Sequence, residues 1–523
     1  MRSVRQHLDD PSLGDGFAAP GGDTVADGCA GGSCGVLAHF KLDVDARGVI
    51  VECSARVRGR ASAFATASAL CEAARGRTVV DAARLGLTTL HPTFAEFDEE
   101  DRERALVAED GFHHALGRWV LARMHEAGSG TGALRPEIPA AIADPDARPT
   151  IVVGMSGGVD SAVALHRLLD DTAGRAIGAT LRLWIDPRAP DPEAACCSPD
   201  SVRRARTTCH AAGAPHLSID LRESFAREVV VPFVTEYATG RTPNPCVRCN
   251  GRFRLDELVR LADVLGAPRV ATGHYARTVE RHGSTLLARG TDTTKDQSYM
   301  LAQVEPATAA RLEFPLGDTH KVHVRAHASE LGLEQATTPE SQEVCFLGGG
   351  DYRQFLSRAG AMGTPGEIVL RRGTGEGEEA MDEVVGTHDG VARFTPGQRK
   401  GIGVSAPHPL YVLDVDPDSG RVLVGAADDS LARTRVKVDD LVWHDPVPPQ
   451  RVHVQLRYRA RDGATAARVV DLGSDGTAVL EFDDAQRAPA PGQAAVLYDD
   501  DGVVLGVARI VREPALARAR SGR

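Results

Sequence analysis

A glycine-rich loop between an apolar run and a helix-like run, TIVVGMSGGVDSAV at residues 150–163, most constrains how this chain can fold. The apolar run predicts a buried strand, and the residues after the loop predict a helix. Backbone N–H groups at the start of a helix attract anions, and glycines let the backbone approach a phosphate closely. The loop has neither the Lys-Ser/Thr ending of a Walker loop nor the spacing of a dinucleotide fingerprint. We expect a phosphate site here, against the alternative of a glycine-rich turn without a ligand.

The alternation of strands and helices continues beyond that loop. Strands are predicted at 176–185, 215–221 and 269–276, and helices at 161–171, 201–213, 223–240 and 255–266. Strands that alternate with helices of this length predict an α/β domain with a doubly wound parallel sheet. Ligands of such sheets bind at the carboxyl ends of the strands, where the glycine-rich loop would lie.

The chain has 523 residues, which is too long for one hydrophobic core, so several domains are expected. Residues 128–149 are rich in Gly, Pro and Asp, as exposed linkers are, and the apolar runs around Asp-Ser-Gly at 411–425 predict a hairpin. Short strands in the last part of the chain predict a small β-barrel. The expected parts are an α+β domain with its linker at 1–146, the α/β domain with the glycine-rich loop at 147–350, a small central domain at 351–429 and the barrel at 430–523.

Composition excludes several classes of protein. The chain lacks a long apolar run and its first residues lack the apolar segment of a secretory signal, so we expect a cytoplasmic protein without a membrane partner. Ten cysteines are too few for a disulfide scaffold of this length, and in a reducing compartment thiols serve metal binding or catalysis. A net charge of -12 argues against a nucleic-acid binder that relies on overall charge, but it allows local basic patches.

Two cysteines lie three residues apart in TPNPCVRCN, at Cys246 and Cys249. This spacing is typical of half a zinc site, of a redox pair or of a centre that handles sulfur. The spacing alone does not choose among the three.

Seven motifs give the loop and the cysteines a common context. The loop resembles the SGGxDS pyrophosphate loop of the ATP pyrophosphatase superfamily, whose members transfer AMP to a substrate oxygen. With it occur, in order, GRTPNPCVRCN, ATGHYAR, RGTDTTKDQSYML, FPLGDTHK, SQEVCFLGG, FTPGQRKGIGV and LRYRARDG. Together they resemble the tRNA-specific 2-thiouridylases from about residue 149 to 511. The resemblance implies ATP-dependent 2-thiolation of the wobble uridine (U34) of tRNA.

The resemblance implies a nucleotide site at the carboxyl edge of the sheet. Its residues are Gly154, Met155, Ser156, Gly157, Gly158, Val159, Asp160, Ser161, Leu181 and Gly273. ATP would bind with Mg²⁺, and Asp160 either holds that ion or caps the helix start. Leu181 would line the adenine pocket, with plain packing as the alternative.

The resemblance also assigns the sulfur chemistry and the tRNA contacts. Cys249 matches the family's nucleophile, and Cys345 matches the cysteine that carries a persulfide. The resemblance further implies that ATP adenylates uracil O2, which makes that oxygen part of a leaving group. Cys246 stands where many relatives have aspartate, so it would lie beside the target base rather than react. The residues that match tRNA-binding stretches are Asn244, Pro245, Cys246, Lys295, Asp296, Gln297, Arg457 and Tyr458. For Arg457 and Tyr458 a solvated face with a core tyrosine is the alternative, and Arg254 replaces a family lysine.

Metal sites remain open at this point. Cys246, Cys249 and Cys345 would suit a [4Fe-4S] cluster with one open iron, an alternative route for sulfur donation. A structural zinc site lacks an obvious fourth ligand. Simple core or surface thiols are expected at Cys196, Cys197 and Cys209, and structural histidines at His274 and His388.

The amino-terminal part resembles a NifU-type iron–sulfur scaffold domain over roughly residues 8 to 128, with a damaged set of ligands. Cys34 occupies the first ligand position, but Arg60 stands at the second and GFHHALG at the last offers histidine. Cys29, Cys34, Cys53 and Cys71 could still bind metal or receive sulfur, although core packing suits Cys71 better. We expect a degenerate scaffold that docks a cysteine desulfurase, or another persulfide donor, and passes sulfur to the enzyme.

Two other functions fit parts of the sequence. An amidating or ligating ATP pyrophosphatase would form AMP with an amino donor and incorporate no sulfur. An iron–sulfur scaffold or carrier with a regulatory nucleotide domain would transfer clusters without modifying RNA, and the damaged ligand set argues against it.

Overall fold

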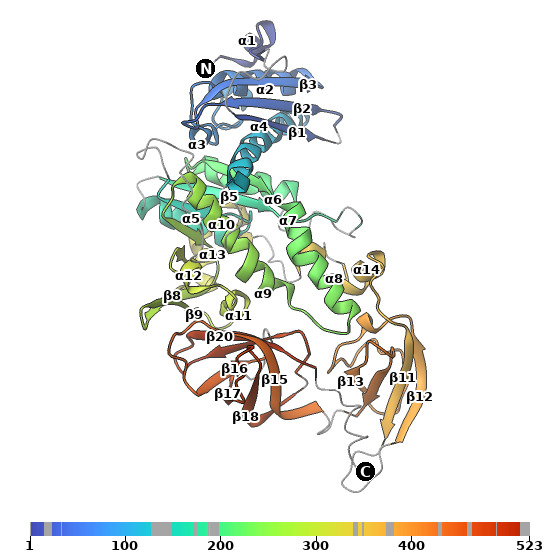
Figure 1. Ribbon diagram of the computed structural model, residues 1–523. Coiled ribbons are helices and arrows are strands. Elements are labelled where there is room, and N and C mark those ends of the chain that lie inside the picture. The colour runs from blue at the N-terminus through green and yellow to red at the C-terminus, as the bar shows by residue number, and fades with distance from the viewer. Residues whose placement is uncertain are drawn as a thin grey trace.

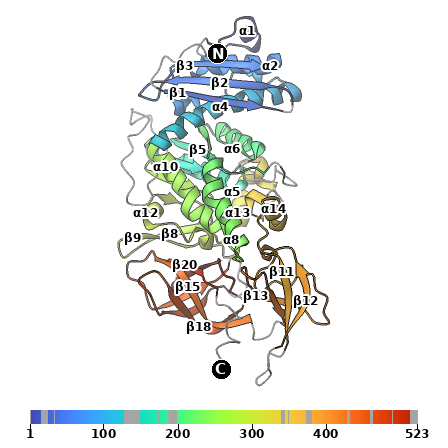
Figure 2. The same cartoon turned by 45° about the vertical axis from the view of Figure 1, so that its right-hand side comes forward.

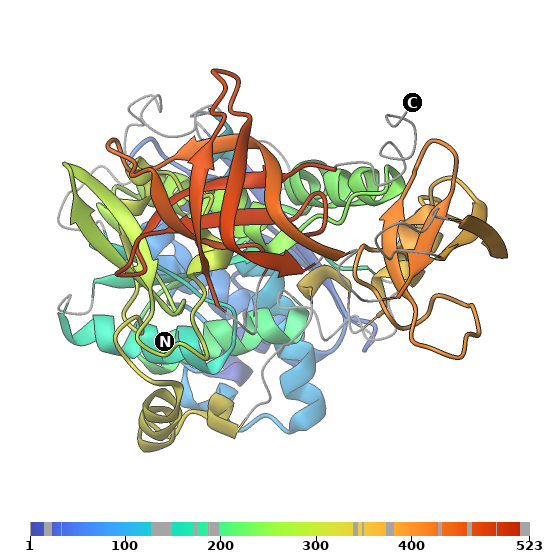
Figure 3. The same ribbon diagram turned by 90° about the horizontal axis from the view of Figure 1, so that it is seen from below.

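The computed structural model describes residues 2–14, 24–32, 34–126, 149–171, 175–186, 188, 198–337, 344–347, 350–372, 381–426, 431–457, 463–487 and 489–512. These residues form an elongated molecule with the amino-terminal domain at one end (Figure 1). The nucleotide domain lies in the middle, and the barrel and the central domain lie side by side at the other end (Figures 2 and 3). Among the described helices, none is long and apolar enough to cross a membrane.

The amino-terminal domain is an antiparallel sheet packed against helices. The sheet has the order β1-β2-β3, formed by Thr24–Gly31, Leu37–Val44 and Ile50–Arg58. The helices are α1 (Val4–Asp9), α2 (Ala61–Ala74), α3 (Val79–Ala82) and α4 (Glu99–Glu126). Small residues let α4 approach the sheet, since a Cβ on Gly28 would lie 2.2 Å from the backbone nitrogen of Ala115. The expected strands and small-residue helix are therefore present.

The nucleotide domain contains the expected parallel sheet, in the order β10-β7-β4-β5-β6. Its strands are β4 (Ile151–Gly154), β5 (Ala176–Arg182), β6 (His216–Asp220), β7 (Arg269–Thr272) and β10 (Leu312–Glu313). Helices α5 (Val159–Asp171), α6 (Pro199–Ala211), α10 (Leu255–Leu265), α12 (Pro306–Ala309) and α13 (Lys321–Glu330) accompany it. The strands are almost wholly buried, as strands covered on both faces are.

The segment expected as one helix at 223–240 is divided. It consists of α7 (Arg222–Phe225), a π-helical turn (Ala226–Val230) and α8 (Val231–Ala238). Pro232 lies in the first turn of α8 and has no N–H to donate to the carbonyl of Glu228, which an α-helix would require. Proline thus disturbs the helical ladder next to the π-helical turn.

The last part of the chain forms two β structures (Figure 3). The central sheet has the order β12-β11-β14-β13, formed by β11 (Gly366–Arg372), β12 (Met381–His388), β13 (Tyr411–Val415) and β14 (Val422–Gly425). The closed barrel contains β15 (Ala432–Trp443), β16 (Arg451–Gln455), β17 (Thr465–Val470), β18 (Ala478–Arg487), β19 (Ala494–Tyr498) and β20 (Val504–Ile510). Both the hairpin at 411–425 and the barrel are confirmed.

Smaller elements connect these parts. They are α9 (Pro245–Cys249), a π-helical turn (Asn250–Arg254), β8 (Ala276–Arg281), β9 (Ser284–Arg289), α11 (Ser298–Leu301) and α14 (Tyr352–Arg358). The β8–β9 hairpin reaches the barrel, where Ala288 pairs with Val503. On the opposite side, α4 runs from the amino-terminal sheet onto β6 (Figure 1).

Candidate active site

The glycine-rich loop follows the carboxyl end of β4 and leads into α5. Gly157 has a φ of +76°, and a Cβ there would lie 2.4 Å from the carbonyl oxygen of Ser201. Gly273, just after β7, contacts the start of α5 so closely that a Cβ would lie 2.7 Å from the carbonyl carbon of Asp160. Both positions therefore require glycine, one for its backbone conformation and both for the close approach.

The Ser161 hydroxyl holds the loop in shape. The Ser156 N–H donates to Ser161 Oγ at 3.2 Å, and that hydroxyl donates to the carbonyl of Gly158 at 3.0 Å. Ser156 is exposed, while Gly154 ends β4 and Val159 begins α5. The loop thus presents backbone N–H groups at a helix start, an arrangement that can bind phosphate.

Asp160 is engaged by a lysine that sequence analysis did not single out. Lys321 Nζ lies 2.7 Å from both carboxylate oxygens, and the Tyr275 hydroxyl donates to one of them at 2.9 Å. Asp160 lies inside the first turn of α5, so it is not the residue that caps the helix. The sequence could have identified Lys321, because this residue is the last of the FPLGDTHK motif.

The loop offers Mg²⁺ one carboxylate, that of Asp160, which is already paired with Lys321. Magnesium is commonly held by one or two carboxylates together with substrate phosphates. The described residues therefore fit an ion that arrives with ATP rather than a metal site built by the protein alone.

Leu181 and His274 occupy the neighbouring strand ends. Leu181 lies near the carboxyl end of β5 and is buried, which suits both an adenine contact and plain packing. His274 Nδ1 lies 2.8 Å from Thr272 Oγ1, and burial lowers the pKa of His274 to about 3. His274 is therefore neutral and structurally paired, as is His388, which contacts the carbonyl of Gly420 at 2.8 Å.

The Cys-x-x-Cys motif forms α9. Asn244 caps this helix, because its Oδ1 accepts from the N–H groups of Cys246 and Val247 at 3.1 and 3.3 Å, and Pro245 occupies the first helical position. Cys246 is partly exposed, whereas Cys249 is 5% exposed. The Asn-Pro before the cysteines thus fixes where the helix begins.

Arg248, next to Cys249, fixes α9 against the divided helix. Its Nε donates to the carbonyl of Glu228 at 2.5 Å, the same carbonyl that Pro232 cannot serve. The arginine supplies a hydrogen bond to a carbonyl that lacks its α-helical donor.

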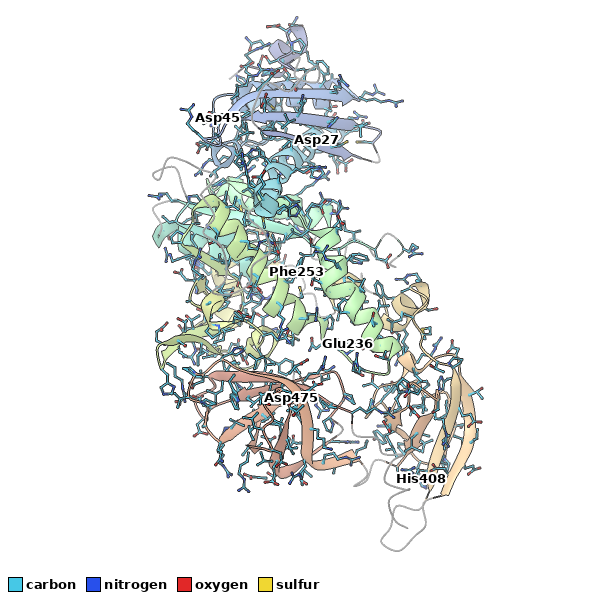
Figure 4. All side chains as sticks on the ribbon, in the orientation of Figure 1. Asp27, Asp45, Glu236, Phe253, His408 and Asp475 are labelled. Atoms are coloured by element: carbon cyan, nitrogen blue, oxygen red, sulfur yellow. The ribbon has the colours of Figure 1, made fainter. Side chains whose placement is uncertain are left out.

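The two predicted reactive cysteines belong to segments that pack on one residue. Phe253, four residues after Cys249, lies 5.7 Å from Phe225 between ring centroids, and Phe346, next to Cys345, lies 6.1 Å from it. Phe225 ends α7, the short helix that follows the carboxyl end of β6, so both segments pack on the connection that leaves this edge of the sheet (Figure 4 labels Phe253). Segments about a hundred residues apart thus meet at the edge where ligands of such sheets bind.

The cysteines do not form a ligand set in this structure. Within the described ranges, which include Cys246, Cys249 and Cys345, no group of three or more His, Cys, Asp or Glu side chains could hold a metal ion. Cys246, Cys249 and Cys345 are thus not gathered as a three-ligand site in this structure, and a [4Fe-4S] cluster at these residues stays a prediction.

The predicted tRNA contacts lie in several places. Asp296 accepts from the N–H groups of Gly290 and Ser298 at 3.0 and 3.1 Å, and Gln297 Oε1 accepts from the N–H of Tyr275 at 2.9 Å. These oxygens hold the loop before α11, and Lys295 is half-buried beside them. Arg457 is exposed after β16, while Tyr458 lies outside the described residues.

A cavity of about 100 Å³ lies between the cysteine motif and the barrel. Its lining includes Asn244, Pro245, Arg248, Arg252, Gln303 and Arg509. Glu236, at the end of α8 above the barrel (Figure 4), also lines it. Both domains therefore shape one polar hollow beside the predicted reactive residues.

Two of the amino-terminal cysteines form a close buried pair, and the other two are more exposed. Cys53 and Cys71 are buried with their Sγ atoms 3.4 Å apart, and burial raises the pKa of the Cys71 thiol well above its ordinary value. Cys29 is exposed on β1 and Cys34 is partly exposed. Cys196 and Cys197 lie outside the described residues, and Cys209 is a buried core thiol whose pKa burial also raises.

Models of three domain families match this chain. The "tRNA methyl transferase HUP domain" matches residues 149–349, the "tRNA methyl transferase PRC-barrel domain" residues 364–426 and the "Aminomethyltransferase beta-barrel domain" residues 433–510. The matches agree with the parallel sheet, the central sheet and the closed barrel.

Several curated proteins are similar over long stretches. The tRNA-specific 2-thiouridylase MnmA of Acidithiobacillus ferrooxidans is 41% identical over 68% of this chain and 96% of its own length. The bifunctional protein NifU/MnmA of Rubrobacter xylanophilus is 38% identical and covers 98% of both chains, including the amino-terminal domain. These similarities show that the chain belongs to the MnmA family of tRNA-specific 2-thiouridylases, in the form that carries an amino-terminal NifU-like domain.

Proposed function

We propose that this chain catalyses the ATP-dependent 2-thiolation of the wobble uridine of tRNA. The observation that carries the proposal is the placement of three segments along one edge of the parallel sheet, where two of them pack on one phenylalanine. The glycine-rich loop follows β4, and the segments of Cys249 and Cys345 both pack on Phe225 after β6. A nucleotide bound at the loop would lie at the same edge as both thiols.

The first step is adenylation. Uracil O2 attacks the α-phosphorus of ATP, the bond to the β-phosphate breaks, and pyrophosphate leaves. The loop's N–H groups and Lys321 would hold the phosphates, because they place positive charge where the leaving pyrophosphate gains negative charge. Asp160 keeps Lys321 at that place.

The second step replaces oxygen by sulfur. The terminal sulfur of a persulfide on Cys345 attacks C2, and the C2–O bond breaks as AMP leaves. The Cys249 thiolate then attacks Cys345 Sγ, which breaks the S–S bond and leaves the sulfur on the base. The protein ends with a Cys249–Cys345 disulfide, which an external thiol reductant opens before the next turnover.

The tRNA would bind across the nucleotide domain and the barrel. The cavity beside α9 is lined by both, and it contains Arg248 and Arg252 for phosphates, whereas its third arginine, Arg509, is paired with Asp439 at 2.8 Å. Asn244, Pro245 and Cys246 would meet the target base, with Lys295, Asp296, Gln297 and Arg457 as further contacts. The persulfide would come from a cysteine desulfurase or another donor.

Mass spectrometry of tRNA nucleosides tests this proposal. Unmodified tRNA is incubated anaerobically with the full chain, ATP, Mg²⁺ and a persulfide donor, and we expect 2-thiouridine together with AMP. A matched reaction with Cys345→Ser should yield no 2-thiouridine. AMP formation that requires an amino donor and incorporates no sulfur would instead identify an amidating or ligating enzyme.

A further inference from the structure

Two adjacent carboxylates on α4 hold a buried arginine of the nucleotide domain. Arg206, on α6, is 2% exposed; its Nε lies 2.6 Å from Glu109 and its Nη2 lies 2.7 Å from Asp110. A charge buried so deeply is stable only with its partners, so the two domains are fixed to one another here. Asp110 also binds Arg203 at 2.7 Å, which extends the contact along α6.

The amino-terminal domain also fixes β6 directly. The Ala83 carbonyl accepts from the backbone N–H of His216 at 3.0 Å and lies 3.0 Å from His210 Nε2. Farther along β6, the backbone of α4 touches the strand, since a Cβ on Gly117 would lie 1.9 Å from the carbonyl oxygen of Ser218. The amino-terminal domain thus fixes the positions of His216 and Ser218, two alternate residues of β6.

His216 connects β6 to the nucleotide loop through the Thr180 hydroxyl. Its Nε2 lies 2.9 Å from Thr180 Oγ1, and that hydroxyl donates to the carbonyl of Met155 at 3.0 Å. Because the hydroxyl has one hydrogen and the carbonyl only accepts, Nε2 of His216 must carry the proton that Thr180 accepts. Burial lowers the pKa of His216 well below its ordinary value, which keeps the ring neutral.

The carbonyl of Met155 shares a peptide unit with the N–H of Ser156. In a trans peptide these two groups point in opposite directions. The carbonyl points to Thr180, so the N–H points into the loop, where it meets Ser161 Oγ at 3.2 Å. The Met155 N–H is fixed as well, by the carbonyl of Ala179 at 2.8 Å. Thr180 therefore sets the direction of an N–H group in the phosphate cradle.

We propose that the amino-terminal domain is a positioning element for nucleotide binding, acting through β6, His216 and Thr180 on the Met155–Ser156 peptide. The inference rests on the proposed binding of ATP to the loop. It gives this domain a role that needs neither a metal nor a sulfur ligand. Thr180 and His216 are positioning residues, because neither forms part of the loop.

The first test compares two substitutions of Thr180 in the full chain. Thr180→Val removes the hydroxyl at nearly constant volume, and we expect it to weaken ATP binding about tenfold, as the loss of one hydrogen bond predicts. Thr180→Ser keeps the hydroxyl and should bind ATP within about threefold of the unaltered chain. Calorimetry gives the Kd, and pyrophosphate release gives KM and kcat. We expect Thr180→Val to raise the KM for ATP rather than to lower kcat.

The second test starts from the amino-terminal domain. Gly117→Ala pushes a methyl group into β6 and should weaken ATP binding, whereas Arg118→Ala, exposed on the same helix, should not. In a double-mutant cycle, Gly117→Ala should add little to Thr180→Val, because both act on the same peptide.

Each outcome has one meaning. If the unaltered chain binds no ATP, the proposed function fails. If it binds ATP and Thr180→Val binds it equally well, or Thr180→Ser is as impaired as Thr180→Val, the positioning role is wrong. Fully additive effects of Gly117→Ala and Thr180→Val would show that the amino-terminal domain does not act through Thr180.

Discussion

The nucleotide loop and the amino-terminal domain use their motif residues in opposite ways. At the loop, Gly157 and Gly273 occupy positions where a Cβ would clash with neighbouring backbone, and the Ser161 hydroxyl bonds the loop backbone. Among the described residues of the amino-terminal domain the cysteines form no three-ligand site, and Cys53 and Cys71 are a close pair within the core. The comparison teaches that a fold survives through packing, whereas a ligand site survives only if its particular side chains do.

What the amino-terminal domain has kept is close packing. A Cβ on Gly111 would lie 2.9 Å from the carbonyl of Ala38, and Gly117 meets β6 still more closely. Removing residues 1–146 would uncover β6 and leave Arg206 without its carboxylates. Point substitutions therefore separate the roles of the two regions better than a deletion does.

The largest effect is expected at the reactive thiol. Cys249→Ser should lower 2-thiouridine formation by at least about a thousandfold, since it removes the nucleophile, while ATP binding persists. Cys29→Ser, an exposed thiol of the amino-terminal domain, is the control and should retain activity. The assay is nucleoside mass spectrometry; equal activity of both variants would contradict the assignment of Cys249.

The next effect concerns the contact between the regions. Arg206→Met leaves Glu109 buried without its cation, while Asp110 keeps Arg203, and we expect about 3–5 kcal/mol of lost stability in the first unfolding transition. Arg435→Ala removes an exposed arginine, paired with Glu481 at 3.0 Å on the barrel, and should cost at most about 1 kcal/mol. Denaturant unfolding measures both; similar small losses would mean that Arg206 does not join the domains.

A smaller effect is expected at the cation beside the loop. Lys321→Met leaves Asp160 unpaired near the phosphates, so ATP affinity should fall about tenfold to a hundredfold. Asp160→Asn is the matched variant, because it keeps the cation and removes the repelling charge, and its loss should be smaller. Calorimetry with ATP measures both variants. The reverse order would show that Asp160, not Lys321, is the group that matters for phosphate binding.

The smallest expected effect is a pH dependence of the domain contact. Burial lowers the pKa values of His113 and His216 well below the ordinary 6.5, and that of His210 is lowered as well. The unfolded chain therefore binds protons more readily, so stability is lost as the pH falls below 6.5 and is present above it.

Thermal unfolding at pH 7.5 and 5.5 measures this dependence. His113→Gln keeps a donor for the Leu85 carbonyl, which His113 Nε2 meets at 2.8 Å, and should flatten the loss. An unchanged slope in that variant would contradict the assignment to this cluster.

Sequence alone predicted the parts that depend on local pattern. The parallel sheet, the glycine-rich loop, the hairpin and the barrel follow from periodicity and turn residues. Arg206, His216 and Thr180 could not be found in this way, because their roles arise from contacts between segments far apart in the chain. The π-helical turn next to Pro232 also escaped prediction, since periodicity does not distinguish it from an α-helix.

Peptide mapping after one turnover without reductant tests the central claim most directly. The full chain, loaded with persulfide and given ATP and unmodified tRNA, is digested under non-reducing conditions. We predict a disulfide between Cys249 and Cys345, with one AMP formed for each 2-thiouridine. Thiolated tRNA from a protein in which these two cysteines remain unlinked would contradict the account.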